Sequence, residues 1–279
     1  MRAAVAAAAL CAFALTGCGS SNSVSTVVAA ANRTLAAQAS ANTTFVGATL
    51  FGSVRGAVPA RGAFAFQHGI GYQAIDLSRL QAAPPRTDYV VFLPNRFYLQ
   101  PHLASGSALP AGKLWLSTPI TGPRSAGRGR EAFELRILAL NPQFLLDQIA
   151  WGTVSASKGK QVVLNHVPYT THTVTVSLPK AAAGAAGPSA AAMRAAIRDE
   201  LEAAAAAGDK SGKTEIDVWL DGPGHVAETK AVVPGSELGT ISSRLFAFGV
   251  PFSATLPPSS TVLPAKVILG PSESLWQVG

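Results

Sequence analysis

The chain has 279 residues, of which 48% are hydrophobic and only 13% are charged, and its 22 Lys and Arg outnumber its 15 Asp and Glu. This length suffices for one domain with a sizeable core, and the apolar composition excludes a largely disordered chain. The basic residues are scattered rather than gathered into a stripe with aromatic residues, so the positive charge does not predict nucleic-acid binding.

The first predicted element is an export signal. Arg2 precedes an apolar run at residues 3–15, which has the length of a signal-peptide core and is short for a membrane-spanning helix. The run ends in Leu15-Thr16-Gly17-Cys18, which matches the bacterial lipobox and implies cleavage before Cys18 and lipidation of Cys18. We therefore expect an exported protein that is anchored to the outer face of the cell membrane. The other interpretation is an ordinary secretory signal with a chance cysteine.

The chain holds two cysteines, and Cys11 lies within the predicted signal. With Cys18 lipidated, the mature domain has no thiol, which excludes disulfides, thiolate metal sites and cysteine nucleophiles. We divide the chain into a signal peptide at 1–17, a lipidated tether at 18–23, one domain at 24–266 and a C-terminal tail at 267–279.

The domain is expected to begin with a helix at residues 23–39, where Val24, Val27 and Ala31 recur at helical spacing. Short β-runs punctuated by Gly, Pro and Asn follow. The strands predicted in this half are 44–51, 62–67, 69–77, 88–93, 96–100, 113–117 and 132–140.

In the second half, Asn141-Pro142 opens a short predicted helix at 142–149, since Pro is favoured in the first helical turn. The run 167–178 has the cleanest alternation in the chain and predicts a strand. An Ala/Gly linker at 180–187 precedes a long predicted helix at 189–207. The other predicted strands of this half are 153–164, 213–221, 225–233 and 239–248.

Several predicted strands are apolar on both faces. In 88–93, Tyr89 and Val91 face one way while Val90 and Phe92 face the other. An antiparallel sheet with one face in water should carry polar residues at alternate positions. These strands are therefore covered on both faces, either by protein alone or by protein on one face and a ligand on the other.

The order of these motifs resembles the LolA-like lipoprotein-carrier superfamily, in particular the exported LppX- and LprG-type lipoproteins of high-GC Gram-positive bacteria. Besides the lipobox, the resemblance rests on the Gly-rich region 62–77, Gly112-Lys113-Leu114-Trp115-Leu116, Asn141-Pro142, Val167-Pro168-Tyr169 and the run 216–226. The predicted elements amount to about ten or eleven antiparallel strands and about three helices. The resemblance implies an α+β, mainly β fold, in which a strongly curved antiparallel sheet forms an incomplete barrel and helices close its concave side. Pro84-Pro85-Arg86 and the basic loop 122–130 depart from the family pattern.

In that family the space between sheet and helices holds acyl chains, which implies a monomeric carrier of a lipid or acylated ligand that needs no cofactor. We expect its cavity wall to include Phe64, Phe66, Val90, Phe92, Val174, Val176, Val218, Phe246 and Phe248. The alternative is a membrane-anchored interaction or sensor module of the same fold with a filled core.

The sequence lacks the common catalytic motifs. It has no Gly-x-Ser-x-Gly elbow, no phosphate-binding Gly-rich loop and no His-Glu-x-x-His. His166 and His172 lack a third ligand nearby, and Asp217 and Asp221 lie on the polar face of one predicted strand. We therefore expect neither a metal site nor enzyme activity.

Overall fold

The computed structural model describes residues 18–48, 55–76, 78, 87–101, 109–120, 138, 140–206, 208–232 and 239–264. The predicted signal peptide and the predicted tail lie outside the described residues. So does most of the predicted strand 132–140, whose two described residues, Leu138 and Leu140, are helical.

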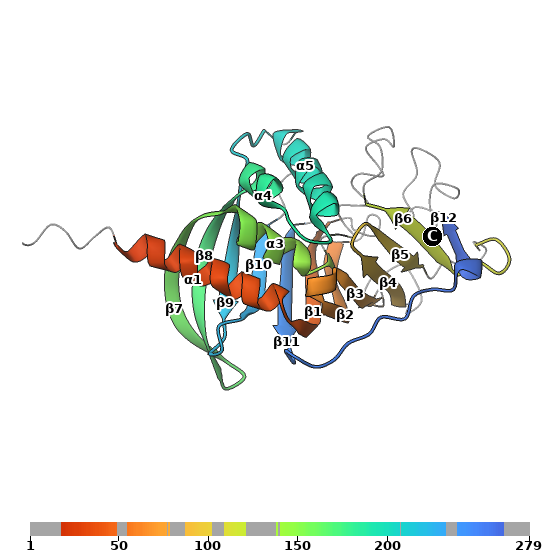
Figure 1. The fold of residues 1–279 in the computed structure, drawn as a ribbon, viewed down its shortest axis with the longest axis horizontal. Helices are drawn as coiled ribbons and strands as arrows, with labels where there is room; N and C mark the ends of the chain where they lie inside the picture. The colour runs from red at the N-terminus through yellow and green to blue at the C-terminus, as the bar shows by residue number, and fades with distance from the viewer. Residues whose placement is uncertain are drawn as a thin grey trace, which may run out of the picture.

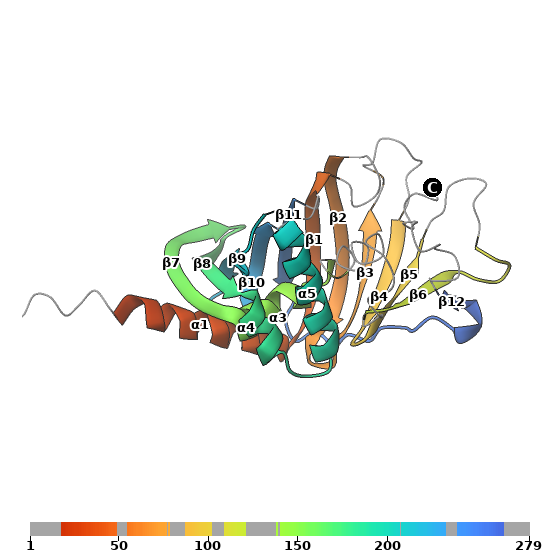
Figure 2. The same cartoon turned by 90° about the horizontal axis from the view of Figure 1, so that it is seen from above.

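Twelve strands form one sheet in the order β12-β6-β5-β4-β3-β2-β1-β11-β10-β9-β8-β7. Every neighbouring pair is antiparallel except β12 and β6, which are parallel. The sheet curves, with β7 at one end and β12 at the other, and it does not close (Figure 2). The predicted incomplete barrel is therefore confirmed. The strands are β1 Gln38–Ala48, β2 Arg55–Ala65, β3 Ile70–Asp76, β4 Thr87–Leu93, β5 Arg96–Gln100, β6 Trp115–Pro119, β7 Thr153–Leu164, β8 Val167–Ser177, β9 Lys213–Leu220, β10 Val226–Val232, β11 Thr240–Phe246 and β12 Val262–Pro264.

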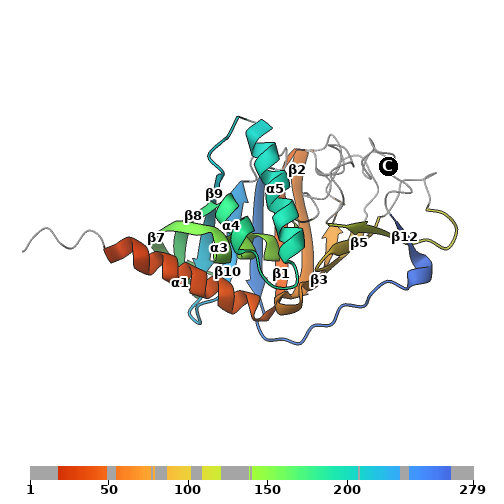
Figure 3. The ribbon, with the colours of Figure 1, turned by 45° about the horizontal axis from the view of Figure 1, so that its top comes forward.

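Helices lie on the concave side of this sheet. They are α1 Cys18–Leu35, α3 Gln143–Gly152, α4 Leu178–Gly184 and α5 Ala190–Ala206. Helix α1 crosses the half of the sheet that holds β7 to β10, and it packs on α3 (Figure 1). Helices α4 and α5 lie side by side next to α3 (Figure 3). Two short 3-10 turns, Phe66–His68 and Ser259–Thr261, also occur.

Helix α1 is fixed at its C-terminal end by Thr34. This side chain is fully buried, and its Oγ1 accepts a 2.8 Å hydrogen bond from the backbone N–H of Val226 at the start of β10. The same hydroxyl donates to the carbonyl of Ala30 at 2.9 Å. Because α1 also buries Val27 and Ala31, one apolar face and one hydroxyl hold the helix on the sheet.

Several segments differ from the sequence-based expectation, and two of the differences lie around β1 and α4. The predicted helix 23–39 ends at Leu35, and residues 38–43 belong to β1, where small residues alternate between the two faces of the sheet. The predicted linker 180–187 is mostly helix α4. The hydroxyl of Ser177 caps this helix by accepting from the backbone N–H of Lys180, and Pro179 occupies its first turn.

After β11 the chain forms a strap, residues 247–261, which passes one end of the strands that lie between β11 and β12 and leads into β12 (Figure 1). Gln38 holds the strap at two points: its carbonyl accepts from the N–H of Gly249 at 2.9 Å, and its Oε1 accepts from the N–H of Phe252 at 2.6 Å. The ring of Phe252 stacks on Tyr72 of β3 with the ring centroids 5.6 Å apart.

The end of the sheet that β7 forms is irregular. Strand β7 shifts register against β8 twice, between Thr153 and Ser155 and between Lys158 and Gln161. Most of its residues from Val154 onward are exposed.

Candidate functional site

The candidate site is the concave face of the sheet. Strand pairing places alternate residues of each strand on this face, and most of them are buried. Small residues lie at its centre among larger side chains such as Phe64 and Ile75: Ala39, Ala41, Ala60, Gly62, Gly71 and Ala231. Bulky residues flank the centre on both sides: Val90, Phe92, Phe97, Leu99 and Leu116 towards β12, and Val174, Val176, Ile216, Val218 and Leu220 towards β7.

Seven of the nine residues expected in a cavity wall are buried on the helix side of the sheet, in two separate groups. Phe64 stacks on Phe66 with ring centroids 5.5 Å apart and lies 5.9 Å from the ring of Phe92. Val90 neighbours Phe92 on the same face of β4. Val174, Val176 and Val218 form the second group, on β8 and β9, and all three are fully buried.

The remaining two residues lie elsewhere. Leu245 pairs with Ala41 and points to the concave side, so its neighbour Phe246 lies on the opposite face and is 43% exposed. After Phe246 the backbone of Ala247 turns to φ 54°, which ends the alternation. Phe248 therefore belongs to the strap and stacks on His225 with ring centroids 4.3 Å apart.

A row of buried polar side chains crosses the apolar face, and the sequence analysis did not identify it. Strand pairing aligns Thr43 of β1 with Ser243 of β11, Ser243 with Thr229 of β10, Thr229 with Val218 of β9, and Val218 with His172 of β8. Gln73 of β3 joins the row from the other side. We call Gln73, Thr43, Ser243, Thr229 and His172 the interior polar row; each is at most 4% exposed.

Gly62 makes the first link of the row possible. Gln73 pairs with Gly62 of β2, and its Nε2 donates a 2.9 Å hydrogen bond to Thr43 Oγ1 on β1, the strand beyond. A Cβ on Gly62 would collide with the carbonyl oxygen of Tyr72 and would lie 2.8 Å from Gln73 Cγ. Thr43 Oγ1 lies in turn 3.2 Å from Ser243 Oγ, which continues the chain of hydrogen bonds.

Three atoms of the row have no hydrogen-bond partner among the described residues: Gln73 Oε1, Thr229 Oγ1 and His172 Nδ1. Buried polar atoms are normally paired, and leaving one unpaired costs about 1–3 kcal/mol. Burial, and to a lesser degree the charge of Lys158 on β7, lower the pKa of His172, so its imidazole is neutral at pH 7.

Two buried carboxyl groups lie in the helical layer. Burial raises the pKa of Asp147 in α3 to about 8, against the opposing hydrogen bond with Gln143. Burial also raises the pKa of Glu200 in α5 to about 7, although Gln148 Nε2 donates a 2.8 Å hydrogen bond to its Oε2. Asp147 Oδ2 and Gln148 Oε1 have no partner among the described residues.

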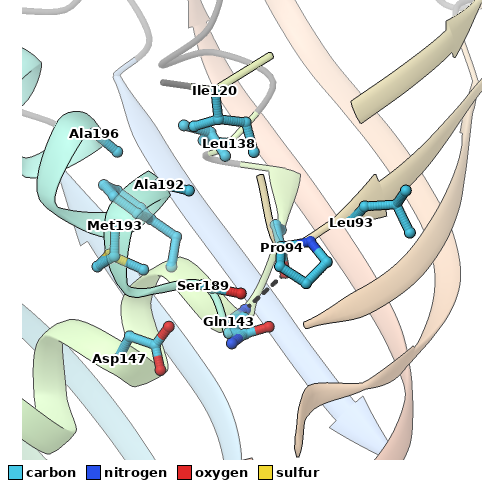
Figure 4. A pocket seen from close by; sticks show the side chains of 12 residues that line it. Leu93, Pro94, Ile120, Leu138, Gln143, Asp147, Ser189, Ala192, Met193 and Ala196 are labelled. Atoms are coloured by element: carbon cyan, nitrogen blue, oxygen red, sulfur yellow. Dashed lines mark hydrogen bonds between the residues drawn. The ribbon is translucent and has the colours of Figure 1, made fainter. Parts of the chain in front are cut away.

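A small cavity lies between α5, α3 and the β4–β5 turn (Figure 4). Ala192, Met193 and Ala196 of α5 face Gln143 and Asp147 of α3 across it. Its volume of about 20 Å³ accommodates one water molecule. A groove of about 240 Å³ lies on the other side of the sheet, between the strap and the aromatic side chains Tyr72, Tyr89 and Trp115.

Among the residues that the structure describes, no cluster of three His, Cys, Asp or Glu could hold a metal ion. Within the same residues, every helix is too short or too polar to cross a membrane.

No protein-family model and no curated protein matches the chain. Among solved structures, it is similar to LprF from Mycobacterium bovis, with 11% identity and a TM-score of 0.42 over 85% of this chain and 97% of that one. It is similar to the lipoprotein LppX from Mycobacterium tuberculosis, with 14% identity and a TM-score of 0.43 over 83% and 96%. A LolA superfamily protein from Nitrosomonas europaea matches with 6% identity and a TM-score of 0.29 over 90% and 97%.

Proposed function

We propose that the protein is a membrane-anchored lipoprotein that binds the acyl chains of a lipid or acylated ligand against the concave face of its sheet, for transport or presentation at the cell envelope. In this proposal lipidated Cys18 holds a single domain, residues 24–266, at the outer face of the cell membrane.

The composition of the concave face carries this proposal. Ala39, Ala41, Ala60 and Ala231 lie at its centre among larger buried side chains such as Phe64, and apolar side chains border that centre on both sides, so a bound acyl chain would meet hydrocarbon across most of the sheet. Each methylene that an acyl chain removes from water contributes about 0.8 kcal/mol, so a chain of a dozen methylenes has a strong drive to enter.

Within the described residues, the cavity beside α5 holds about one water molecule, so an acyl chain would enter there only after α5 has moved away from the sheet. Helix α5 is suited to this movement, since it packs chiefly on α4 and is joined to α3 by the Gln148–Glu200 hydrogen bond.

The test is mass spectrometry of organic extracts from the full-length protein purified from its native membrane. We expect lipid in a fixed ratio to protein. Phe92→Ala, on the concave face, should lower this ratio, whereas Phe246→Ala, on the opposite face, should leave it unchanged. If Phe92→Ala does not fold, Phe92→Leu replaces it. Folded wild-type protein without any extractable lipid would contradict the proposal and favour the interaction or sensor module.

A further inference from the structure

The interior polar row is an unusual component of a wall that only has to hold hydrocarbon. It lies among apolar side chains, and its residues come from β3, β1, β11, β10 and β8, so it crosses most of the sheet. In the middle of the row the polar side chains bond to one another: Thr43 Oγ1 accepts from Gln73 Nε2 and lies within hydrogen-bond distance of Ser243 Oγ.

Three polar atoms at the two flanks of the row have no hydrogen-bond partner among the described residues. Gln73 Oε1 lies at one side, and Thr229 Oγ1 and His172 Nδ1 lie at the other. Thr229 is two strands from Thr43, and His172 is two strands from Thr229, so each interval is about 10 Å at the usual strand spacing.

We infer that the interior polar row binds free hydroxyl groups of the cargo, and that the protein therefore selects neutral lipids that carry hydroxyls close to the buried acyl chain. This inference rests on the proposed function and names the class of lipid bound.

The chemistry of the unpartnered atoms leads to this class. Gln73 Oε1 only accepts, so its partner must carry an O–H or N–H. Thr229 Oγ1 both donates and accepts, and a neutral imidazole presents one donor and one acceptor. A hydroxyl group can donate to Gln73 Oε1 at one flank, and a hydroxyl at the other flank can pair with Thr229 or His172. An ester carbonyl can only accept a hydrogen bond, so it cannot serve as the partner of Gln73 Oε1. A carboxylate also only accepts, and it would place a negative charge against that oxygen.

The test compares two neutral esters with the same acyl chain: 1-monooleoylglycerol, which has two free hydroxyls, and methyl oleate, which has none. Their affinities are measured by the shift in Tm of the delipidated full-length protein at equal lipid concentrations in one detergent. We expect 1-monooleoylglycerol to bind about tenfold more tightly, which corresponds to one or two additional hydrogen bonds.

Thr229→Val is the diagnostic variant, because Val has nearly the same shape and lacks the hydroxyl. It should lose most of the preference for 1-monooleoylglycerol, and its Tm without lipid should be unchanged or higher because an unpartnered hydroxyl is removed. Thr229→Ser should keep the preference. The matched control is Thr43→Val, which should lower the Tm without lipid because that hydroxyl has partners.

Each outcome decides a separate question. Equal binding of both esters, or a preference that survives Thr229→Val, would overturn the inference and leave the acyl-chain proposal intact. Binding of neither ester, together with the absence of co-purified lipid, would overturn the proposed function and this inference with it.

Discussion

Gln148 and Glu200 join two helices through a buried hydrogen bond: Nε2 of Gln148 in α3 lies 2.8 Å from Oε2 of Glu200 in α5. Glu200 lies on the same face of α5 as Met193, Ala196, Ile197 and Ala204, all of them buried. A single carboxyl group within an apolar helix face thus contributes to holding α5 on the helical layer.

The burial of Glu200 predicts that stability falls as pH rises. The pKa of Glu200 is about 7 in the folded protein, against 4.5 for a glutamate that is not buried. Between these two pH values the folded state therefore retains a proton that the unfolded state releases. Its contribution is fully present below pH 4.5 and is lost by about pH 7, a change of about 3 kcal/mol. Asp147, with a pKa of about 8, acts in the same direction over pH 3.8–8.

Thermal unfolding between pH 5 and pH 8 checks this prediction. Wild-type Tm should fall with pH, and Glu200→Gln, which preserves an acceptor for Gln148, should flatten the profile. Identical pH profiles for the wild type and Glu200→Gln would contradict a role for this carboxyl.

A second prediction concerns Gly62. Gly62→Ala should destabilise the fold by about 1–3 kcal/mol, because its Cβ would press on the Tyr72 carbonyl and on Gln73 Cγ. Gly222→Ala is the control, since a Cβ there meets nothing within 4 Å. Chemical denaturation of both variants measures the difference, and equal stability of the two would show that β2 and β3 can relax around the new methyl group.

A third prediction concerns Thr34. Thr34→Val leaves the buried N–H of Val226 without its acceptor and should cost about 1–3 kcal/mol in the free energy of unfolding. Thr26→Val in the same helix is the control, because Thr26 is exposed and its hydroxyl bonds only back to the carbonyl of Asn22. If both variants unfold at the same denaturant concentration, Thr34 does not fix α1 to β10.

A fourth prediction concerns the anchor. Cys18→Ser should abolish lipid attachment, so the variant should accumulate as an uncleaved precursor or leave the membrane. Fractionation and intact-protein mass spectrometry check this outcome. A variant that remains in the membrane fraction at the mature mass of the wild type would contradict the lipobox assignment.

Strands in which apolar and polar residues alternate clearly were predictable from the sequence. In β8 and β9, residues such as Val174, Val176, Ile216 and Val218 alternate with polar residues, and the predicted ranges match the observed strands to within a residue. The start of β1 was not predictable in the same way, since Ala39, Ser40 and Ala41 differ too little in size and polarity to indicate a strand.

The interior polar row could not be predicted, because its members are distant in the sequence and individually ordinary. Thr43 and Ser243 are separated by 200 residues, and only the pairing of β1 with β11 brings them together. Phe246 shows a related limit. Its strand is apolar on both faces near its end, so sequence alone did not determine which residue faces inward, and the pairing of Leu245 with Ala41 decides it.

The irregular strand β7 also bears on how such a protein avoids aggregation. An unclosed sheet exposes backbone donors and acceptors at its terminal strands, and a flat terminal strand invites another chain to pair with it. At β7 the two register shifts interrupt the regular spacing of those groups, and Lys158 and Lys160 place positive charges along the strand. Among the described residues the other terminal strand is β12, where Pro264 has no backbone N–H to offer to a further strand. Both ends thus disfavour edge-to-edge association, which allows the sheet to stay open.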